Sequence, residues 1–432
     1  MSYQIKMKLQ ELIKNNFQQK GTQPERAKEL SEQAFAEFEK LGLPTTKHEE
    51  WRYTNLKKID EKDFQINVRS ESVNTFFESL PIKNIAANKL VFVNGNFSIE
   101  LSDIIEKDKS IIISNIFSAR EKHEELFYKH FGKYAKSEGI ALNAMNTALM
   151  NDGAFIFIPE NKTPEYPVII LCISDSSQAN VFYQPRNLIV ISKNSSLKLV
   201  EGYYSKGNNV SFSNNVTEVY AGENATLDHY KIQQESGESY QNNFTQIIQE
   251  SNTNINHVTL TLDGTMVRNN LHFNLNGENC NSLLYGLYVT DKKNHVDNHT
   301  RVDHSKPNCF SNELYKGILK DQSTAVFNGK IFVHKDAQKT NAYQRNQNIL
   351  LSDEATINTK PQLEIFADDV KCTHGATVGQ LDEEPMFYLR SRGIPENEAR
   401  KMLLNAFADA IAEEIKIPEL VAIIEEEINH KL

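Results

Sequence analysis

The residues best suited to chemistry gather between residues 360 and 379, where two adjacent aspartates, a thiol and an imidazole lie within a few residues of one another. If this segment is extended, alternate side chains share a face, so Cys372 and His374 point the same way, as soft metal or sulfur ligands would. Two ligands are too few for a closed structural metal site, which normally takes four. Metal or sulfur bound here would be held transiently or shared with a second chain. The alternative is a buried thiol beside a hydrogen-bonding histidine.

Two aspartates and two glycines flank this pair. Asp368 and Asp369 are either hard ligands or hydrogen-bond acceptors for His374, or solvated carboxylates of a turn, and we favour the turn. Gly375 and Gly379 suit backbone geometry better than phosphate binding. The chain contains no GxxxxGK[ST] sequence, so we expect no nucleotide hydrolysis by this chain alone.

A second group of candidate ligands lies upstream. His295, Asp297 and His299 would share one face of an extended strand, which is an acceptable arrangement for a metal, and Asp303 and His304 follow closely. A polar outer face of the β region explains the same pattern, and we favour that interpretation. The segment from 48 to 53 holds the only Trp of the chain. It lacks the two histidines of an HExxH zinc motif, so we predict that it serves packing and docking and not metal binding.

Helical periodicity marks the two ends of the chain, and the middle reads as short strands. Residues 1 to about 60 carry apolar residues at helical spacing, with a second helix predicted to start near Pro24. From about 155 to 370, short apolar runs alternate with polar turns, and a small residue opens each new run. These starts lie about 27 to 32 residues apart, except for one gap of about 43. They are Ser195, Ala225, Thr253, Cys280, Ser323 and Ala355.

A degenerate strand–turn–strand period of this kind is typical of a β-solenoid, in which each coil buries its apolar face only against its neighbours. A large β-sandwich also produces many short strands, so both architectures fit the residues. We expect helical caps at both ends of a solenoid, because a bare terminal coil exposes its core and a strand edge.

Near the C-terminus, Met402, Leu403, Phe407 and Ile411 form an apolar stripe at helical spacing. The stripe is either part of an intramolecular core or a helix face that binds a groove on a partner protein.

The bulk composition excludes several function classes. A net charge of -10 over 432 residues argues against nucleic acid as a main partner. The four cysteines are widely spaced without a CxxC pair, which favours a reducing compartment over a disulfide framework. No stretch approaches the roughly 20 apolar residues of a membrane span, and residues 1–6 lack the apolar core of a signal peptide. We therefore expect a cytoplasmic protein with no membrane partner.

Several segments together resemble the SufB/SufD family of iron–sulfur cluster assembly proteins, and within it the SufD branch. Residues 360–379 resemble the family's C-terminal signature nearly residue for residue, and residues 387–394 also match it well. The likeness extends over most of the chain. The sulfur-accepting cysteine and glutamate motif of the SufB branch are not recognisable here.

The resemblance implies a mainly β fold with a right-handed parallel β-helix core between helical terminal domains. It leads us to divide the chain into four parts. They are an N-terminal helical domain (1–84), a mixed α/β segment leading into the core (85–154), the β-helix core (155–386) and a C-terminal helical domain (387–432).

The resemblance also implies a non-catalytic subunit that works with a SufB-like paralogue and a SufC-like ABC ATPase, and indirectly with a cysteine desulfurase system. His374 and Cys372 are then candidate transient iron or sulfur ligands at the SufB interface, and Met402, Leu403, Phe407 and Ile411 candidate ATPase-docking residues. A transient Fe–S cluster would form at that interface, with no cofactor stably bound by this chain alone. Such complexes have been associated with reduced flavin. Without SufB, a homodimer is expected.

Two other function classes remain as rivals. A β-helix carbohydrate-active enzyme, similar to polysaccharide lyases, would need clustered acids and a basic catalyst on one face, whereas the acids here are scattered. A stand-alone dimeric interaction protein is the weaker rival.

Overall fold

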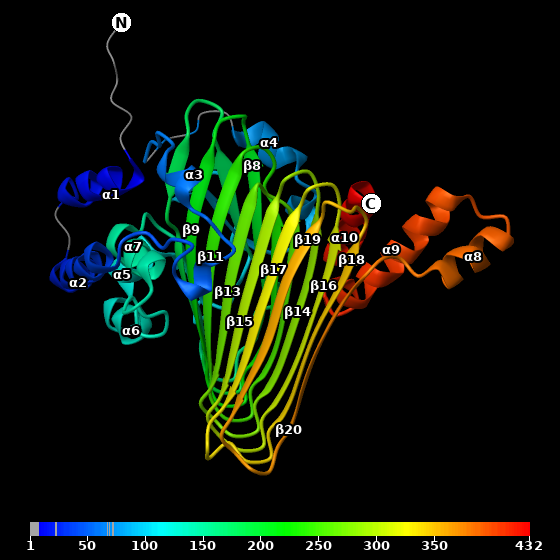
Figure 1. Cartoon of the computed structure of the whole chain (residues 1–432). Helices are drawn as coiled ribbons and strands as arrows, with labels where there is room; N and C mark the ends of the chain where they lie inside the picture. The colour runs from blue at the N-terminus through cyan, green and yellow to red at the C-terminus, as the bar shows by residue number, and fades with distance from the viewer. Residues whose placement is uncertain (1–7, 22–23, 67, 69, 71–72) are drawn as a thin grey trace, which may run out of the picture.

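The computed structural model describes every residue except 1–7, 22–23, 67, 69 and 71–72, so the expectation for residues 1–6 lies outside its described part. Figure 1 shows a long β body with helices beside it. The N-terminal helices are α1 (Leu9–Gln18), α2 (Glu25–Leu41), η1 (Glu49–Trp51), α3 (Lys57–Asp60), α4 (Val73–Ser79), η2 (Pro81–Asn84), α5 (Ile116–Lys122), α6 (Glu124–His130) and α7 (Ala141–Leu149). The C-terminal helices are α8 (Glu383–Ser391), α9 (Glu396–Ala412) and α10 (Pro418–Lys431).

The body is a parallel β-helix made of two ten-stranded sheets. The first sheet contains β1 (Asn88–Val93), β2 (Asn96–Phe97), β5 (Val168–Asp175), β8 (Ser196–Lys206), β10 (Thr226–Gln234), β12 (Asn254–Asp263), β14 (Asn281–Thr290), β16 (Phe310–Leu319), β18 (Asn341–Leu350) and β20 (Lys371–Gly379). The second contains β3 (Ile112–Asn115), β4 (Ala154–Ile158), β6 (Val181–Tyr183), β7 (Arg186–Ile191), β9 (Ser211–Ala221), β11 (Ser239–Gln249), β13 (Met266–Leu275), β15 (His295–His304), β17 (Thr324–Val333) and β19 (Thr356–Ile365).

From β7 onward, successive strands alternate between the sheets and each pairs with the strand one coil away, always parallel. This confirms the mainly β, parallel β-helix fold with helices at both termini. It excludes the sandwich, whose sheets are antiparallel. Among the strands in the described part of the chain, only β2 and β3, at the start of the body, pair antiparallel to their neighbours.

The predicted corners are real, and asparagine makes them. Asn194, Asn224, Asn252 and Asn279 have φ of 57°, 59°, 62° and 58°, the left-handed region that Asn tolerates better than most residues. The small residue that follows each one is buried, so the chain turns inward and begins a new strand of the first sheet.

The predicted series of corners mixes the two edges of the β-helix. Cys309 opens β16 as Cys280 opens β14, so the apparent gap after Cys280 contains a regular corner. Ser323 and Ala355 instead precede β17 and β19, which belong to the second sheet. Their turns lie on the opposite edge, which explains why the interval from Cys280 to Ser323 departs from the period of the other starts.

The helices cover sheet faces, and the expectation of a cap at each end is wrong for the C-terminal end. Leu404, Ile411 and Ile424 of the C-terminal helices pack against the first sheet, in a cluster that includes Tyr230 and Leu287. On the second sheet, α7 packs against β9. The last coil, β19 and β20, consequently stays uncovered in the described chain, and most of its side chains are exposed or half-buried.

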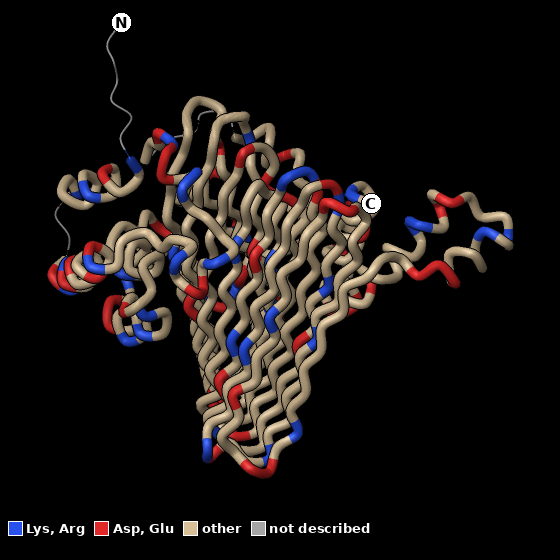
Figure 2. The backbone as a smooth tube through the Cα atoms, viewed as in Figure 1, with Lys and Arg blue, Asp and Glu red and all other residues tan. Residues whose placement is uncertain are grey.

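Charged residues of both signs are interspersed along helices and turns, as Figure 2 shows, and no single-sign face is visible in this view. In the described part of the chain, no helix combines the length and apolar character needed to cross a membrane.

Candidate functional site

The predicted Cys372–His374 pair lies on β20, the last strand of the first sheet. Cys372 is in register with Ala342 of β18, and His374 with Gln344. Ala342 and Gln344 are fully buried between the sheets, so the side chains of Cys372 and His374 share the inner face of the β-helix, as the alternation predicted. Because no further coil stacks above them in the described chain, Cys372 is only half-buried and His374 is exposed.

Beneath His374 the interior is polar. Gln344 Nε2 donates a hydrogen bond to Glu313 Oε2 at 2.8 Å, and Glu313 lies one further coil down on β16. Burial raises the pKa of Glu313 to about 7. Partial burial also raises the pKa of the Cys372 thiol. The pair thus offers an exposed imidazole and a protonated thiol at the open end of a polar interior.

The open edges of β19 and β20 differ. The backbone N–H groups of Thr356 and Phe366 donate to the preceding coil, so even-numbered residues of β19 bond inward and odd-numbered ones face the open edge. Pro361 occupies one of these open positions, and a proline there removes a donor from the edge. On β20, Lys371 N donates inward to Thr340 O at 2.9 Å, and the strand holds no proline. The backbones of His374 and Ala376 therefore face outward, available to another strand.

Asp368 and Asp369 lie in the exposed turn between β19 and β20, as the turn interpretation predicted. The N–H of Asp369 donates to Gln338 Oε1 at 2.9 Å, and its carbonyl accepts from Lys339 N. The two aspartates serve the turn.

The second candidate group is held by ion pairs. Asp297 pairs with Arg268 and, at 2.9 Å, with His299, and it accepts a 2.5 Å hydrogen bond from Thr54. The Arg268 guanidinium in turn lies 4.0 Å from the centre of the Trp51 ring. Burial alone would raise the pKa of Asp297, but the charges of Arg268 and His299 and the hydrogen bond to His299 together lower it. These contacts hold η1 and the following residues, as far as Thr54, against the second sheet.

His295 stays with this group, because its Nε2 lies 2.7 Å from the Thr54 hydroxyl, whereas Asp303 and His304 lie apart from it. His304 faces the interior and contacts Ser311, whereas Asp303 bonds Arg301 on the outer face. Among the residues that the structure describes, no three His, Cys, Asp or Glu side chains are arranged to hold a metal ion.

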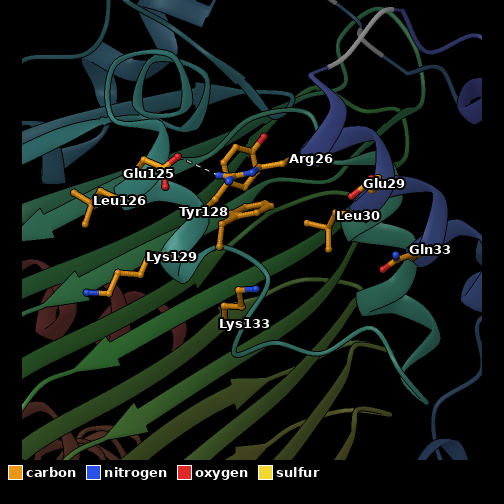
Figure 3. A pocket seen from close by; sticks show the side chains of 10 residues that line it. Arg26, Glu29, Leu30, Gln33, Glu125, Leu126, Tyr128, Lys129 and Lys133 are labelled. Carbon is orange, nitrogen blue, oxygen red and sulfur yellow. Dashed lines mark hydrogen bonds and ion pairs between the residues drawn. The ribbon is translucent and has the colours of Figure 1, made fainter.

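A surface hollow of about 680 Å³ opens between α2 and α6 (Figure 3). Arg26 spans it, 3.4 Å from Glu125 and 5.6 Å from the centre of the Tyr128 ring. This ion pair is exposed to solvent, and an exposed pair of this kind contributes little.

Comparison with known proteins agrees with this architecture. The family described as "SUF system FeS cluster assembly, SufBD core domain" matches residues 173–407, and "SufBD protein N-terminal region" matches residues 5–170. The chain belongs to the SufBD family. An iron–sulfur cluster assembly SufBD family protein of Synechocystis is 31% identical over 88% of this chain and 85% of its own. SufD of Escherichia coli is 30% identical over 89% and 88%, and SufD of Bacillus subtilis 29% over 97% and 98%. The resemblance to the SufD branch is thereby confirmed.

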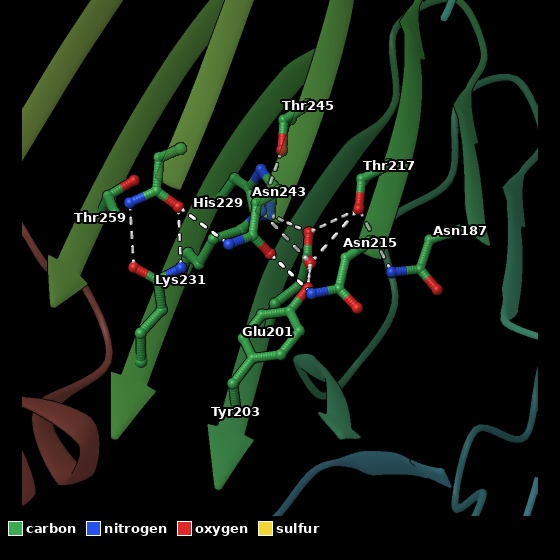
Figure 4. A network of polar contacts seen from close by, with 12 residues as sticks. Asn187, Glu201, Tyr203, Asn215, Thr217, His229, Lys231, Asn243, Thr245 and Thr259 are labelled. Atoms are coloured by element: carbon green, nitrogen blue, oxygen red, sulfur yellow. Dashed lines mark hydrogen bonds and ion pairs between the residues drawn. The ribbon is translucent and has the colours of Figure 1, made fainter. Parts of the chain in front are cut away.

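Sequence reasoning missed the charged interior of this SufBD protein (Figure 4). Glu201 is fully buried and contacts His229 Nε2 at 2.8 Å, Tyr203 Oη at 2.5 Å and Lys231 Nζ at 3.6 Å. Burial would raise the pKa of Glu201, but Lys231 and His229 outweigh it and lower the pKa. Lys231 also donates to Thr245 across the sheets. This network joins the two sheets inside the β-helix.

The apolar stripe of the SufBD C-terminal region serves two purposes. Ile411 is fully buried in the cluster against the first sheet, so its assignment to partner binding is corrected: it belongs to the core. Phe407 is half-buried and its ring lies 4.5 Å from Lys316 Nζ. Leu403 is also half-buried, and Met402 is 50% exposed. Of the four, Met402 is the one most open to a partner.

Proposed function

We propose that this chain is the SufD-type, non-catalytic subunit of a SufB–SufC–SufD complex that assembles iron–sulfur clusters. The observation that supports this most is the open outer edge of the terminal strand β20, which carries Cys372 and His374 in a chain similar to SufD proteins over most of its length. Iron and sulfide are cargo here, and a site with two ligands needs a partner to complete the coordination of iron.

The SufB-like paralogue would pair with the β20 edge. That edge has outward backbone donors and acceptors with no proline, whereas the β19 edge is interrupted by Pro361. Strand addition would bring a second chain beside His374, where the imidazole acts as an iron ligand or a proton carrier. Without the paralogue, two copies of this chain would pair through the same edge as a homodimer.

The SufC-like ATPase would dock on α8 and α9. Phe387 and Tyr388 of α8 are 74% and 57% exposed, and Met402 of α9 adds a third exposed apolar side chain. Helix α8 has no buried residue and projects from the body in Figure 1. Exposed apolar groups on a projecting element are typical of a protein interface. That partner would hydrolyse ATP for the complex, and a cysteine desulfurase would supply its sulfur. Reduced flavin would also bind the complex, which would work in the cytoplasm.

The carbohydrate-active alternative is not favoured. On the outer face of the second sheet, Asp297, Asp303 and Glu364 each pair with a cation, which removes the free acids that such catalysis requires. The family match supports cluster assembly instead.

Co-expression of the full chain with SufB-type and SufC-type partners tests the proposal. A tag on this chain should retain both partners through size-exclusion chromatography, and the complex should hold iron and acid-labile sulfide after anaerobic isolation. Failure to recover either partner, with this chain folded, would contradict the proposal.

A further inference from the structure

Cys280 and Cys309 form a stacked pair of thiols at one edge of the β-helix, well away in the chain from Cys372. They occupy equivalent corners of consecutive coils: the next residues, Asn281 and Phe310, are in register, and Phe310 N donates to Cys280 O at 2.8 Å. Both side chains are 1% exposed. Each sulfur lies 3.3 Å from the same acceptor, the carbonyl oxygen of Gly277.

This stacking meets the backbone requirement of a disulfide. Neighbouring parallel strands lie about 4.8 Å apart. That spacing falls within the Cα separation of roughly 4.4–6.8 Å that a disulfide spans without moving the backbone. The Cα spacing therefore permits a Cys280–Cys309 disulfide, which also requires the two Cβ atoms to approach to roughly 3.5–4.5 Å.

Other coils place a hydroxyl where these two coils place sulfur. Thr253 Oγ1 donates to Glu250 O at 2.9 Å, and Thr340 Oγ1 to Ala337 O at 2.8 Å, each three residues back, as Cys280 donates to Gly277 O. A hydroxyl is the stronger donor, and Ala225 occupies another such corner with no donor at all. The corner's structural needs are thus met without sulfur. Two successive thiols add a capacity for reversible oxidation that the hydroxyl and alanine corners lack.

We propose that Cys280 and Cys309 are a reversible oxidant-sensing dithiol that forms a cross-coil disulfide with a peroxide. The Cys280 thiolate attacks a peroxide oxygen and becomes a sulfenic acid as one water leaves. Cys309 then attacks that sulfur, forming the S–S bond and releasing a second water. Two thiols lose two electrons and two protons, and the peroxide takes up both. A thiol reductant reverses the step by exchange.

The surroundings of the two cysteines indicate which thiol attacks the peroxide and which completes the disulfide. The Cys309 thiol hydrogen-bonds to Cys280 and lowers the pKa of Cys280, and the same contact raises the pKa of Cys309. Cys280 is therefore the attacking thiolate. The two residues before Cys280, Glu278 and Asn279, are exposed, so this buried corner lies next to the protein surface.

The test uses the full chain with Cys372→Ser, so that the half-buried thiol at the open end cannot link two molecules. Hydrogen peroxide is titrated, free thiols are counted in denaturant, and cross-linked peptides are mapped by mass spectrometry. We expect a loss of two of the three remaining thiols, a peptide joining Cys280 to Cys309, and full recovery with dithiothreitol.

Matched variants keep the proposal falsifiable. Cys280→Ser/Cys309→Ser should fold with an unchanged melting temperature, because hydroxyls serve other corners, and should retain its one remaining thiol through the titration. Each single variant should form no internal cross-link. Three results would overturn the proposal. The first is a disulfide that maps to Cys172, and the second is oxidation to sulfinic acid without any disulfide. The third is that Cys280 and Cys309 stay reduced in the wild-type chain when its Cys372 is fully oxidised.

Discussion

His374 lies one coil above Gln344, in register with it on the inner face of the first sheet. Gln344 is fully buried and His374 is exposed, although both occupy the same position of successive coils. The difference arises because the β-helix ends at β20 with no coil or helix covering it in the described chain. A residue at a core position is thereby exposed to solvent.

If β20 is the pairing edge, Ala376→Pro should abolish association with the SufB-type partner and leave the fold intact. The N–H of Ala376 faces outward, so proline removes a donor from the interface and none from the pairing with β18. Size-exclusion chromatography with light scattering measures the association, and circular dichroism the fold. Pro361→Ala, on the other open edge, is the control and should not weaken association.

The buried ion-pair network should dominate local stability. Glu201→Gln leaves the Lys231 ammonium buried without its counter-charge, which should cost about 3–5 kcal/mol in urea unfolding. Glu223→Gln removes an exposed partner of Lys193 and should cost less than about 1 kcal/mol. Equal losses in the two variants would contradict the assignment of Glu201 as a buried carboxylate.

The free energy of unfolding should depend on pH in a way that reflects the raised pKa of Glu313. Its pKa is about 7 in the folded chain against an ordinary value of 4.5. Between these pH values the folded state keeps a proton that the unfolded state has lost, so this residue makes stability fall as pH rises through that window.

Glu313→Gln should remove this loss. Urea unfolding at pH 5 and pH 8 should show a smaller fall than in the wild type, by about 1–3 kcal/mol. Glu223→Gln, an exposed control, should behave as the wild type does. A fall of wild-type size in the Glu313→Gln chain would refute the buried, protonated acid.

Substitutions at two positions of helix α9 should affect different properties, one the stability of the fold and the other the binding of a partner. Ile411→Ala leaves a cavity against the first sheet and should cost about 2–5 kcal/mol of unfolding free energy. Met402→Ala should leave the unfolding free energy nearly unchanged and weaken ATPase binding by about tenfold. Calorimetric titration with the SufC-type partner provides the binding measurement. An unchanged affinity in Met402→Ala would remove α9 from the docking surface.

The corners and the shared face of Cys372 and His374 could be predicted from sequence because both depend on local rules. A left-handed corner favours Asn, as at Asn252, and strand alternation has a fixed period of two. The Glu201 network could not be predicted in this way, because a charge within a strand reads as a solvent-facing residue. Its partner Lys231 lies one coil later, so only the register of β8 with β10 brings them together.

The C-terminal helices show a second limit. The stripe containing Ile411 predicts an apolar face, but periodicity does not specify what that face packs against. The structure places it on the first sheet, which leaves the end of the β-helix open instead of capped.

The most direct test of the account is the iron and acid-labile sulfide content of the complex isolated anaerobically after co-expression with SufB-type and SufC-type partners. His374→Ala is compared with the wild type and with Thr373→Ala, whose exposed side chain lies on the opposite face of β20. We expect the His374→Ala complex to assemble normally and carry little cluster, and the Thr373→Ala complex to load as the wild type does. Equal loading in all three complexes would show that His374 takes no part in cluster formation.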